Sequence, residues 1–265
     1  MLLLSESGDR PVTDNPYASP APVGDTTPVL RKWPRVTFLR MLLGLTIVFV
    51  LVALLFPARR GSREAARRTQ CKNNLKMIAL ALHNYESVYH ALPPAYTVDA
   101  DGKPLHSWRT LILPFVEQLD RYKSIDLTKP WDDPANADAL KTVPYVYRCP
   151  GVALPPNFTS YLGIVGSNAC FHPTAPRAFS EITDGTTETL MVIEVAQEHA
   201  VHWMAPHDAS EEMVLNFGND GKLAHIGGTQ AALADGSVRF LSENLNTETL
   251  RALISIAGND RVGEY

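Results

Sequence analysis

The stretch MLLGLTIVFVLVALLF, residues 41–56, decides how this chain is organised. It continues an apolar run that begins at Val36, and Arg40 is the single charged residue within that run. A helix of roughly 20 apolar residues spans the hydrocarbon core of a bilayer, and an arginine near its end can extend to the headgroups. The sequence therefore predicts a transmembrane helix over residues 36–57. The alternative is a helix buried inside a soluble core.

Basic residues flank this run on both sides, so charge alone does not settle its orientation. Three precede it and five follow it closely: Arg31, Lys32 and Arg35, then Arg59, Arg60, Arg63, Arg67 and Arg68. Because cytoplasmic flanks of membrane helices are enriched in Lys and Arg, the larger group favours a cytoplasmic location for the following residues.

A second helix is predicted directly after the apolar run. The segment SREAARR, residues 62–68, consists of good helix formers, and a proline such as Pro57 is tolerated in membrane helices. The next apolar residues are spaced four, three, four, three and four apart, at Cys71, Leu75, Ile78, Leu82, Tyr85 and Tyr89. This spacing predicts one buried helix face, with Cys71 as a small packing residue, up to the stop at Leu92-Pro93-Pro94. We call residues 58–90 the spine.

The rest of the chain divides into a tail and a head. Residues 1–35 are rich in Pro, Ser, Thr and Asp, which predicts disorder rather than a secretory signal. Residues 58–265 have the apolar content of one folded head domain that includes the spine. The net charge of −4 and the pI near 6.1 exclude general nucleic-acid binding.

Three cysteines are too few for a disulfide scaffold, and no CxxC pair is present. If the head lies outside the cytoplasm, Cys149 and Cys170 are candidates for a disulfide. The alternative is that both are buried free thiols.

Within the head, short strands are expected around a β-hairpin. The hairpin is predicted from HIGGTQAALADGSVRFL, residues 225–241, with strands at 229–234 and 237–241. Gly227 and Gly228 let the chain bend into the first strand, and Asp235-Gly236 is the expected two-residue turn with positive φ at both positions. Other predictions are a helix over 107–122 interrupted near Pro114, strands at 143–150, 160–166 and up to 195, and a closing helix over 246–257 capped by Thr247.

Residues 53–85 resemble the start of a large planctomycete family of unknown function, domain of unknown function 1559, which has a prepilin-type N-terminus. Further resemblance lies in Ser107-Trp-Arg, Pro130-Trp-Asp and the pattern of a His, nine residues and Asp-Gly formed by His225, Asp235 and Gly236. The resemblance implies an α+β, pilin-like fold, in which a long N-terminal helix packs on an antiparallel-rich sheet, and an extracytoplasmic head.

The same resemblance places a peptidase cleavage pair at Arg35-Val36 and the pilin glutamate at Arg40. The family pattern has Gly and Glu at these positions, so this chain departs from it at both. Arg40 would repel the amino terminus that the glutamate attracts. We therefore expect a single-pass protein that is neither cleaved nor polymerised. Its expected partners are the lipid bilayer and other pilin-like or envelope proteins.

Candidate chemical sites are weak in this sequence. A dense group of potential metal ligands follows the strand that ends near 195: Glu194, Glu198, His199, His202, His207 and Asp208. The alternative for this group is a polar loop. His225 with Asp235 is a possible acid–base or metal pair, although turn chemistry explains Asp235 alone. The segments 99–102 and 219–221 resemble fragments of calcium loops but lack the later bidentate acid, so turns are expected.

No GxSxG, P-loop, HExxH or GxGxxG motif occurs in a fitting context. The sequence therefore predicts a membrane-anchored, non-catalytic envelope protein without catalytic, cofactor or metal residues. One alternative is a membrane-tethered ligand-binding module with an aromatic pocket from Trp108, Trp131 and Trp203. A metal-dependent enzyme is the other.

Overall fold

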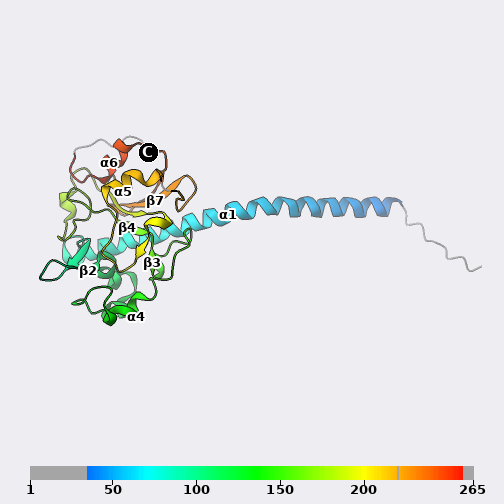
Figure 1. Cartoon of the computed structure of the whole chain (residues 1–265). Helices are drawn as coiled ribbons and strands as arrows, with labels where there is room; N and C mark the ends of the chain where they lie inside the picture. Colours follow the sequence, from blue (N-terminus) through cyan, green and yellow to red (C-terminus); the bar gives the residue numbers. More distant parts are fainter. Residues whose placement is uncertain (1–34, 220, 259–265) are drawn as a thin grey trace, which may run out of the picture. The chain divides into compact units, whose positions relative to one another are not determined.

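The computed structural model describes residues 35–219 and 221–258 (Figure 1). The predicted disordered tail lies almost entirely outside these residues. The chain forms two compact units, residues 1–53 and residues 54–265. The first helix, α1, runs from Arg35 to Tyr89 and contributes to both units.

In the first unit, α1 carries the predicted apolar helix. The window Val36–Leu54 has a mean hydropathy of 2.4, and none of its side chains is buried against the rest of the described chain. Its length and composition are sufficient to cross a bilayer. The hydroxyl of Thr46 donates a hydrogen bond to the Leu43 carbonyl at 2.8 Å, so this polar side chain is satisfied within the helix.

In the second unit, α1 forms the spine, and its apolar stripe is buried as predicted. Cys71, Leu75, Ile78 and Leu82 have no exposed surface. The stripe ends sooner than expected, because Tyr89 is 59% exposed. The helix stops there as His90 adopts a φ of 58°, before the chain reaches the two prolines.

The spine packs against a four-stranded antiparallel sheet. Its strands are β4 (Tyr161–Gly163), β5 (Leu190–Glu194), β7 (Gly228–Leu233) and β8 (Val238–Ser242), in the order β4-β5-β7-β8. Side chains alternate between the two faces: Ala232 belongs to the core beneath the spine, whereas Ala231 and Leu233 belong to a second core.

The second core is covered by two helices, α5 (Glu211–Asn216) and α6 (Thr247–Ile254). In the head these helices lie on the face of the sheet opposite the spine (Figure 1). The fold is therefore α+β, with a long N-terminal helix packed against antiparallel sheets, as predicted.

Short elements complete the head. The hairpin of β1 (Tyr96–Val98) and β2 (Pro104–Ser107) and the pair of β3 (Phe158–Thr159) with β6 (Val201–His202) form two small sheets. The remaining helical turns are α2 (Trp108–Leu111), η1 (Leu113–Val116), α3 (Leu119–Lys123), η2 (Pro134–Asn136), α4 (Ala137–Leu140), η3 (Tyr145–Tyr147), η4 (Phe179–Glu181), η5 (Gln197–His199) and η6 (Phe217–Asn219). The break between α2 and α3 confirms the predicted interruption near Pro114.

The predicted strand at residues 143–150 is wrong. The chain instead forms the 3₁₀ turn η3, in which the Tyr147 amide donates to the Pro144 carbonyl at 3.0 Å. The alternation of apolar residues suggested a strand, but Val146 and Tyr147 are buried side chains of a 3₁₀ turn. The Tyr147 hydroxyl is satisfied at 2.8 Å by the carbonyl of Arg109.

The hairpin is confirmed, but its turn differs from the prediction. Leu233 and Ser237 flank a loop of three residues, and Gly236 has a φ of 84° while Asp235 does not have a positive φ. The Asp235 carboxylate accepts from the Ser237 amide at 2.8 Å. The loop is a tight turn that ends in a left-handed glycine. It needs positive φ at one position, whereas the predicted two-residue turn needs it at two.

The closing helix is shorter than predicted. It begins after Asn246, whose side chain accepts from the Thr249 amide at 2.7 Å, and it ends at Ile254. Asn246 is therefore the N-cap, and Thr247 is the first helical residue.

Candidate functional site

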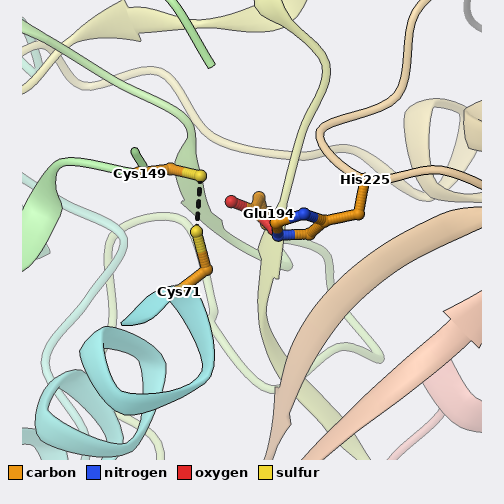
Figure 2. A group of neighbouring side chains, drawn as sticks. All are labelled: Cys71, Cys149, Glu194 and His225. Atoms are coloured by element: carbon orange, nitrogen blue, oxygen red, sulfur yellow. Dashed lines mark hydrogen bonds and ion pairs between the residues drawn. The ribbon is translucent and has the colours of Figure 1, made fainter. Parts of the chain in front are cut away.

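Four buried side chains from distant parts of the sequence meet between the spine and the sheet (Figure 2). Cys71 comes from the spine, Cys149 follows η3, Glu194 ends β5 and His225 precedes β7. One ligand atom from each residue lies within 4.8 Å of the others. We call this group the buried cluster.

The two sulfurs are held together by the contact between the spine and the segment after η3. Their Sγ atoms are 2.6 Å apart. One turn along the spine, the Asn74 side chain donates to the Arg148 carbonyl at 2.9 Å, which fixes the neighbouring Cys149. The Gly151 amide donates to the Cys149 sulfur at 3.1 Å.

Gly151 is required by the close packing at this point. A Cβ atom there would lie 2.9 Å from the Ala224 carbonyl oxygen and 3.1 Å from the His225 ring. Because the first neighbour is backbone, it cannot move aside cheaply. The glycine thus allows the Cys149 segment to approach the segment that carries His225.

Glu194 enters the cluster because of strand alternation. Ile193 points into the second core, so the next residue faces the spine. The Glu194 side chain is fully buried, and its Oε2 atom lies 3.2 Å from Nε2 of His225.

His225 is placed between two carboxylates. Its Nε2 atom faces Glu194, and its Nδ1 atom is 3.0 Å from Oε1 of Glu64. Glu64 is partly exposed and also contacts Arg68, whose Nε atom lies 3.5 Å from the same oxygen.

The surroundings shift the pKa values of these groups in different directions. A hydrogen bond with Cys149 lowers the pKa of Cys71 to about 7, while the same hydrogen bond and burial raise the pKa of Cys149. Burial acts to lower the pKa of His225, but the neighbouring Cys71 and the carboxylates of Glu194 and Glu64 outweigh it and raise the pKa to about 10. Negative charge therefore accumulates around this imidazole.

The cluster is shielded from solvent, which limits what it can do. A surface pocket of about 350 Å³, lined in part by Glu64, Gly151 and His225, reaches its edge, but His225 is only 2% exposed. The four side chains can form ion pairs or bind a cation, and the two thiols can be oxidised to a disulfide.

The six candidate metal ligands after β5 do not form one site. Within the described residues the buried cluster is the group with metal-binding geometry. His202 packs its ring against Trp131 and Phe158, and the Asp208 carboxylate pairs with Arg109. Only Glu194 belongs to the cluster.

Other predicted sites are also rearranged. Asp235 is exposed in its turn, so it does not pair with His225. Trp108 and Trp203 have no exposed surface and form part of the core rather than a pocket. Cys149 and Cys170 are not bonded to each other: both are buried free thiols, the second of the two alternatives, and Cys149 lies against Cys71.

The remaining candidates occupy the expected places. In the segment 99–102, the Asp99 carboxylate accepts from the amides of Asp101 and Lys103, as in a turn. Segment 219–221 includes a position outside the described residues. Arg35 begins α1, and Val36 and Arg40 are exposed on it. Gly227 has a φ of 82°, which fits its predicted bend.

Sequence reasoning did not find the cluster because its members have no motif spacing. A signal existed in two places. Cys71 is the one residue of the stripe with a metal-binding side chain, and Glu194 is a charged residue that ends the buried strand LMVIE. A charge in such a strand requires a partner.

Comparison with known proteins identifies the family. The model of a family described as protein of unknown function (DUF1559) matches residues 60–222, more than half of the chain. The chain therefore belongs to this family. The match includes three members of the buried cluster and ends just before His225. No curated protein matches the chain, and no solved structure matches it.

Proposed function

We propose that this protein is a membrane-anchored, non-catalytic envelope protein of pilin-like build, whose extracytoplasmic head acts through contacts with other proteins. The observation that carries the proposal is the composition of α1. One helix joins an apolar window with no buried side chain, Val36–Leu54, to a spine whose stripe is fully buried in the head from Cys71 to Leu82.

The need to cover the apolar window supports the anchor. The large apolar side chains of this window are each between 45% and 73% exposed. Apolar surface costs about 25 cal/mol per Å² in water, so a helical segment that exposes this many apolar side chains requires a lipid or protein environment. The window has the length of a bilayer core.

Arg35 and Arg40 support an unprocessed anchor. Arg35 is the first residue of the helix and Arg40 lies in its second turn, so both add positive charge near its N-terminal end. A neighbouring subunit's amino terminus would therefore meet two cations rather than a carboxylate. The proposed protein remains full-length and does not polymerise through this end.

The outward face of the spine supports a role in protein contacts. Met77, Leu80 and Val88 are exposed, at 36%, 61% and 58%, and their spacing places them on one helical face. Clustered exposed apolar side chains mark interaction surfaces more often than chance.

The test examines the full-length protein in its native membranes. We expect it to resist carbonate extraction, to keep its intact mass, and to have a head that protease reaches only from the extracytoplasmic side. The double variant Ile47→Arg/Leu51→Arg should leave the membrane fraction, because each charge at mid-bilayer costs about 2.5–3.5 kcal/mol.

The matched control is Leu80→Arg, which places the same charge on the spine. It should stay in the membrane and lose crosslinks to neighbouring proteins. Carbonate release of the wild type would overturn the anchor, a product starting at Val36 would overturn the absence of processing, and cytoplasmic protease access would overturn the topology.

A further inference from the structure

His225 is arranged as metal-binding histidines usually are. One ring nitrogen, Nδ1, is 3.0 Å from the Glu64 carboxylate. In a neutral imidazole this bond places the proton on Nδ1 and leaves the Nε2 lone pair directed into the cluster. Metal-binding histidines commonly donate their second N–H to a carboxylate in this way.

The interior of the cluster contains buried polar atoms without hydrogen bonds. In the described part of the chain, both carboxylate oxygens of Glu194 and Nε2 of His225 lack a hydrogen-bond partner. Nε2 of His225 and Oε2 of Glu194 are 3.2 Å apart, close enough for an ion pair but without a hydrogen bond between them. Leaving a buried polar group unsatisfied is costly, more so for a charged one.

The donor set matches one class of ligand. Two sulfurs, an imidazole nitrogen and a carboxylate oxygen supply four ligand atoms of the types that bind Zn²⁺. We propose that Cys71, Cys149, Glu194 and His225 bind one Zn²⁺ ion. With four protein ligands and no solvent-facing position, the site is structural rather than catalytic.

Binding requires a small rearrangement of the cysteines. Two sulfurs on one tetrahedral zinc lie ~3.8 Å apart for Zn–S bonds of ~2.3 Å, compared with 2.6 Å here. Zinc binding would therefore have to separate the two sulfurs by about 1 Å. The Gly151 amide already donates to the Cys149 sulfur, and such outer hydrogen bonds orient metal ligands.

The site would tie together the parts of the head that meet there. Cys71 lies on the spine, Glu194 ends a central strand, and Cys149 and His225 lie on connecting segments. Glu64 and Arg68 form an outer layer one to two turns before Cys71. The zinc would therefore clamp the spine to the sheet.

The cluster has two alternative states, a disulfide and a metal-free form, and the experiment below distinguishes both from the zinc site. A Cys71–Cys149 disulfide would remove both thiolates and leave the Glu194 carboxylate without a cation other than His225. A metal-free cluster would rely on the imidazolium alone.

The experiment uses the full-length protein in detergent, purified without chelator. Zinc is measured by inductively coupled plasma mass spectrometry. Free thiols are titrated after the protein has been denatured in the presence of a chelator. We expect one zinc and three thiols per chain. One thiol with no zinc, or three thiols with no zinc after reduction and addition of Zn²⁺, would overturn the proposal.

Variants locate the ion. Cys149→Ser and Glu194→Gln should lose stoichiometric zinc, whereas Cys170→Ser, which removes the buried thiol outside the cluster, should retain it. If the first two fail to fold, Glu64→Gln leaves all four ligands in place and should weaken zinc affinity 10- to 100-fold. Unchanged affinity in that variant would contradict the proposed outer layer.

A spectroscopic measurement on the unaltered protein completes the test. Co²⁺ replacing Zn²⁺ should show thiolate-to-cobalt charge transfer and the intense visible bands of tetrahedral cobalt. Cys170→Ser should leave this spectrum unchanged. A spectrum of octahedral cobalt without charge transfer would overturn the assignment.

Discussion

The Nη1 atom of Arg109 lies 2.5 Å from Oδ1 of Asp208, and both side chains are buried in the head. The guanidinium also donates to the carbonyls of Trp203, Ala205 and His207, and the same carboxylate accepts from Trp108 and the Gly163 amide. Burial raises the pKa of Asp208 despite the arginine. This pair ties α2 to the segment after β6.

Removing the carboxylate charge should destabilise the head strongly. In Asp208→Asn the Arg109 charge remains buried without its partner, which costs about 3–5 kcal/mol. Urea unfolding followed by tryptophan fluorescence measures this effect, since Trp108 and Trp203 are buried beside the pair. The exposed pair of Lys141 and Asp138 offers a control, and Asp138→Asn should leave the unfolding midpoint unchanged. Similar midpoints for both variants would contradict the expected difference.

The two adjacent glycines before the hairpin should respond differently to alanine. Gly227 has positive φ but open space around a Cβ atom, so Gly227→Ala should cost about 1–2 kcal/mol. At Gly228 a Cβ atom would overlap the Leu241 carbonyl oxygen and crowd the Phe240 ring. Because backbone has to move, Gly228→Ala should be the more damaging change. Unfolding free energies of the two variants rank them, and the reverse order would refute the steric explanation.

The cap of the closing helix gives a third prediction. Asn246→Ala removes the bond to the Thr249 amide and should lower the free energy of unfolding by about 1 kcal/mol. Thr247→Ala, one residue later, should change it much less. The sequence pattern alone assigned these roles the other way round.

His106 should make the stability of the head depend on pH. Its ring is fully buried, Nε2 lies 2.8 Å from the Lys129 carbonyl, and burial lowers its pKa. The unfolded chain takes up a proton near pH ~6.5 whereas the folded chain resists it. Stability contributed by the neutral ring is thus present above that pH and is lost as pH falls below it.

The measurement compares unfolding midpoints at neutral and mildly acidic pH. His106→Gln retains an amide donor for the Lys129 carbonyl but does not titrate. We expect the decrease on acidification to be smaller in this variant than in the wild type. An equal decrease in both would show that other groups dominate.

Local periodicity predicted the parts of this fold that depend on neighbouring residues. The stripe from Cys71 to Leu82 is buried because helical spacing aligns it on one face, and the hairpin at 228–242 follows from alternation and a glycine turn. The error at η3 concerns the type of element and the error at Asn246 a helix boundary, and in each case local backbone hydrogen bonds or a side-chain cap decide the conformation.

The buried cluster could not be predicted in the same way. Cys71 and Cys149 are separated by 78 residues, and their contact depends on how the spine packs on the sheet. The roles of Asp208 and Glu194 likewise follow from which face of a layer each occupies. Sequence identified both as acidic residues near a strand but could not separate the one that pairs with Arg109 from the one that faces the sulfurs.

The position of the spine within the core has a consequence for the order of synthesis. Leu75 and Leu82 leave the ribosome early, yet they share a core with Ala232 and Val238 near the other end of the head. At roughly 5–20 residues per second, the chain needs about 10–30 s to produce those last partners. During that interval the apolar stripe is made but uncovered. The spine is the first segment of the head to be made, and the core around it is complete only when the last strands have followed.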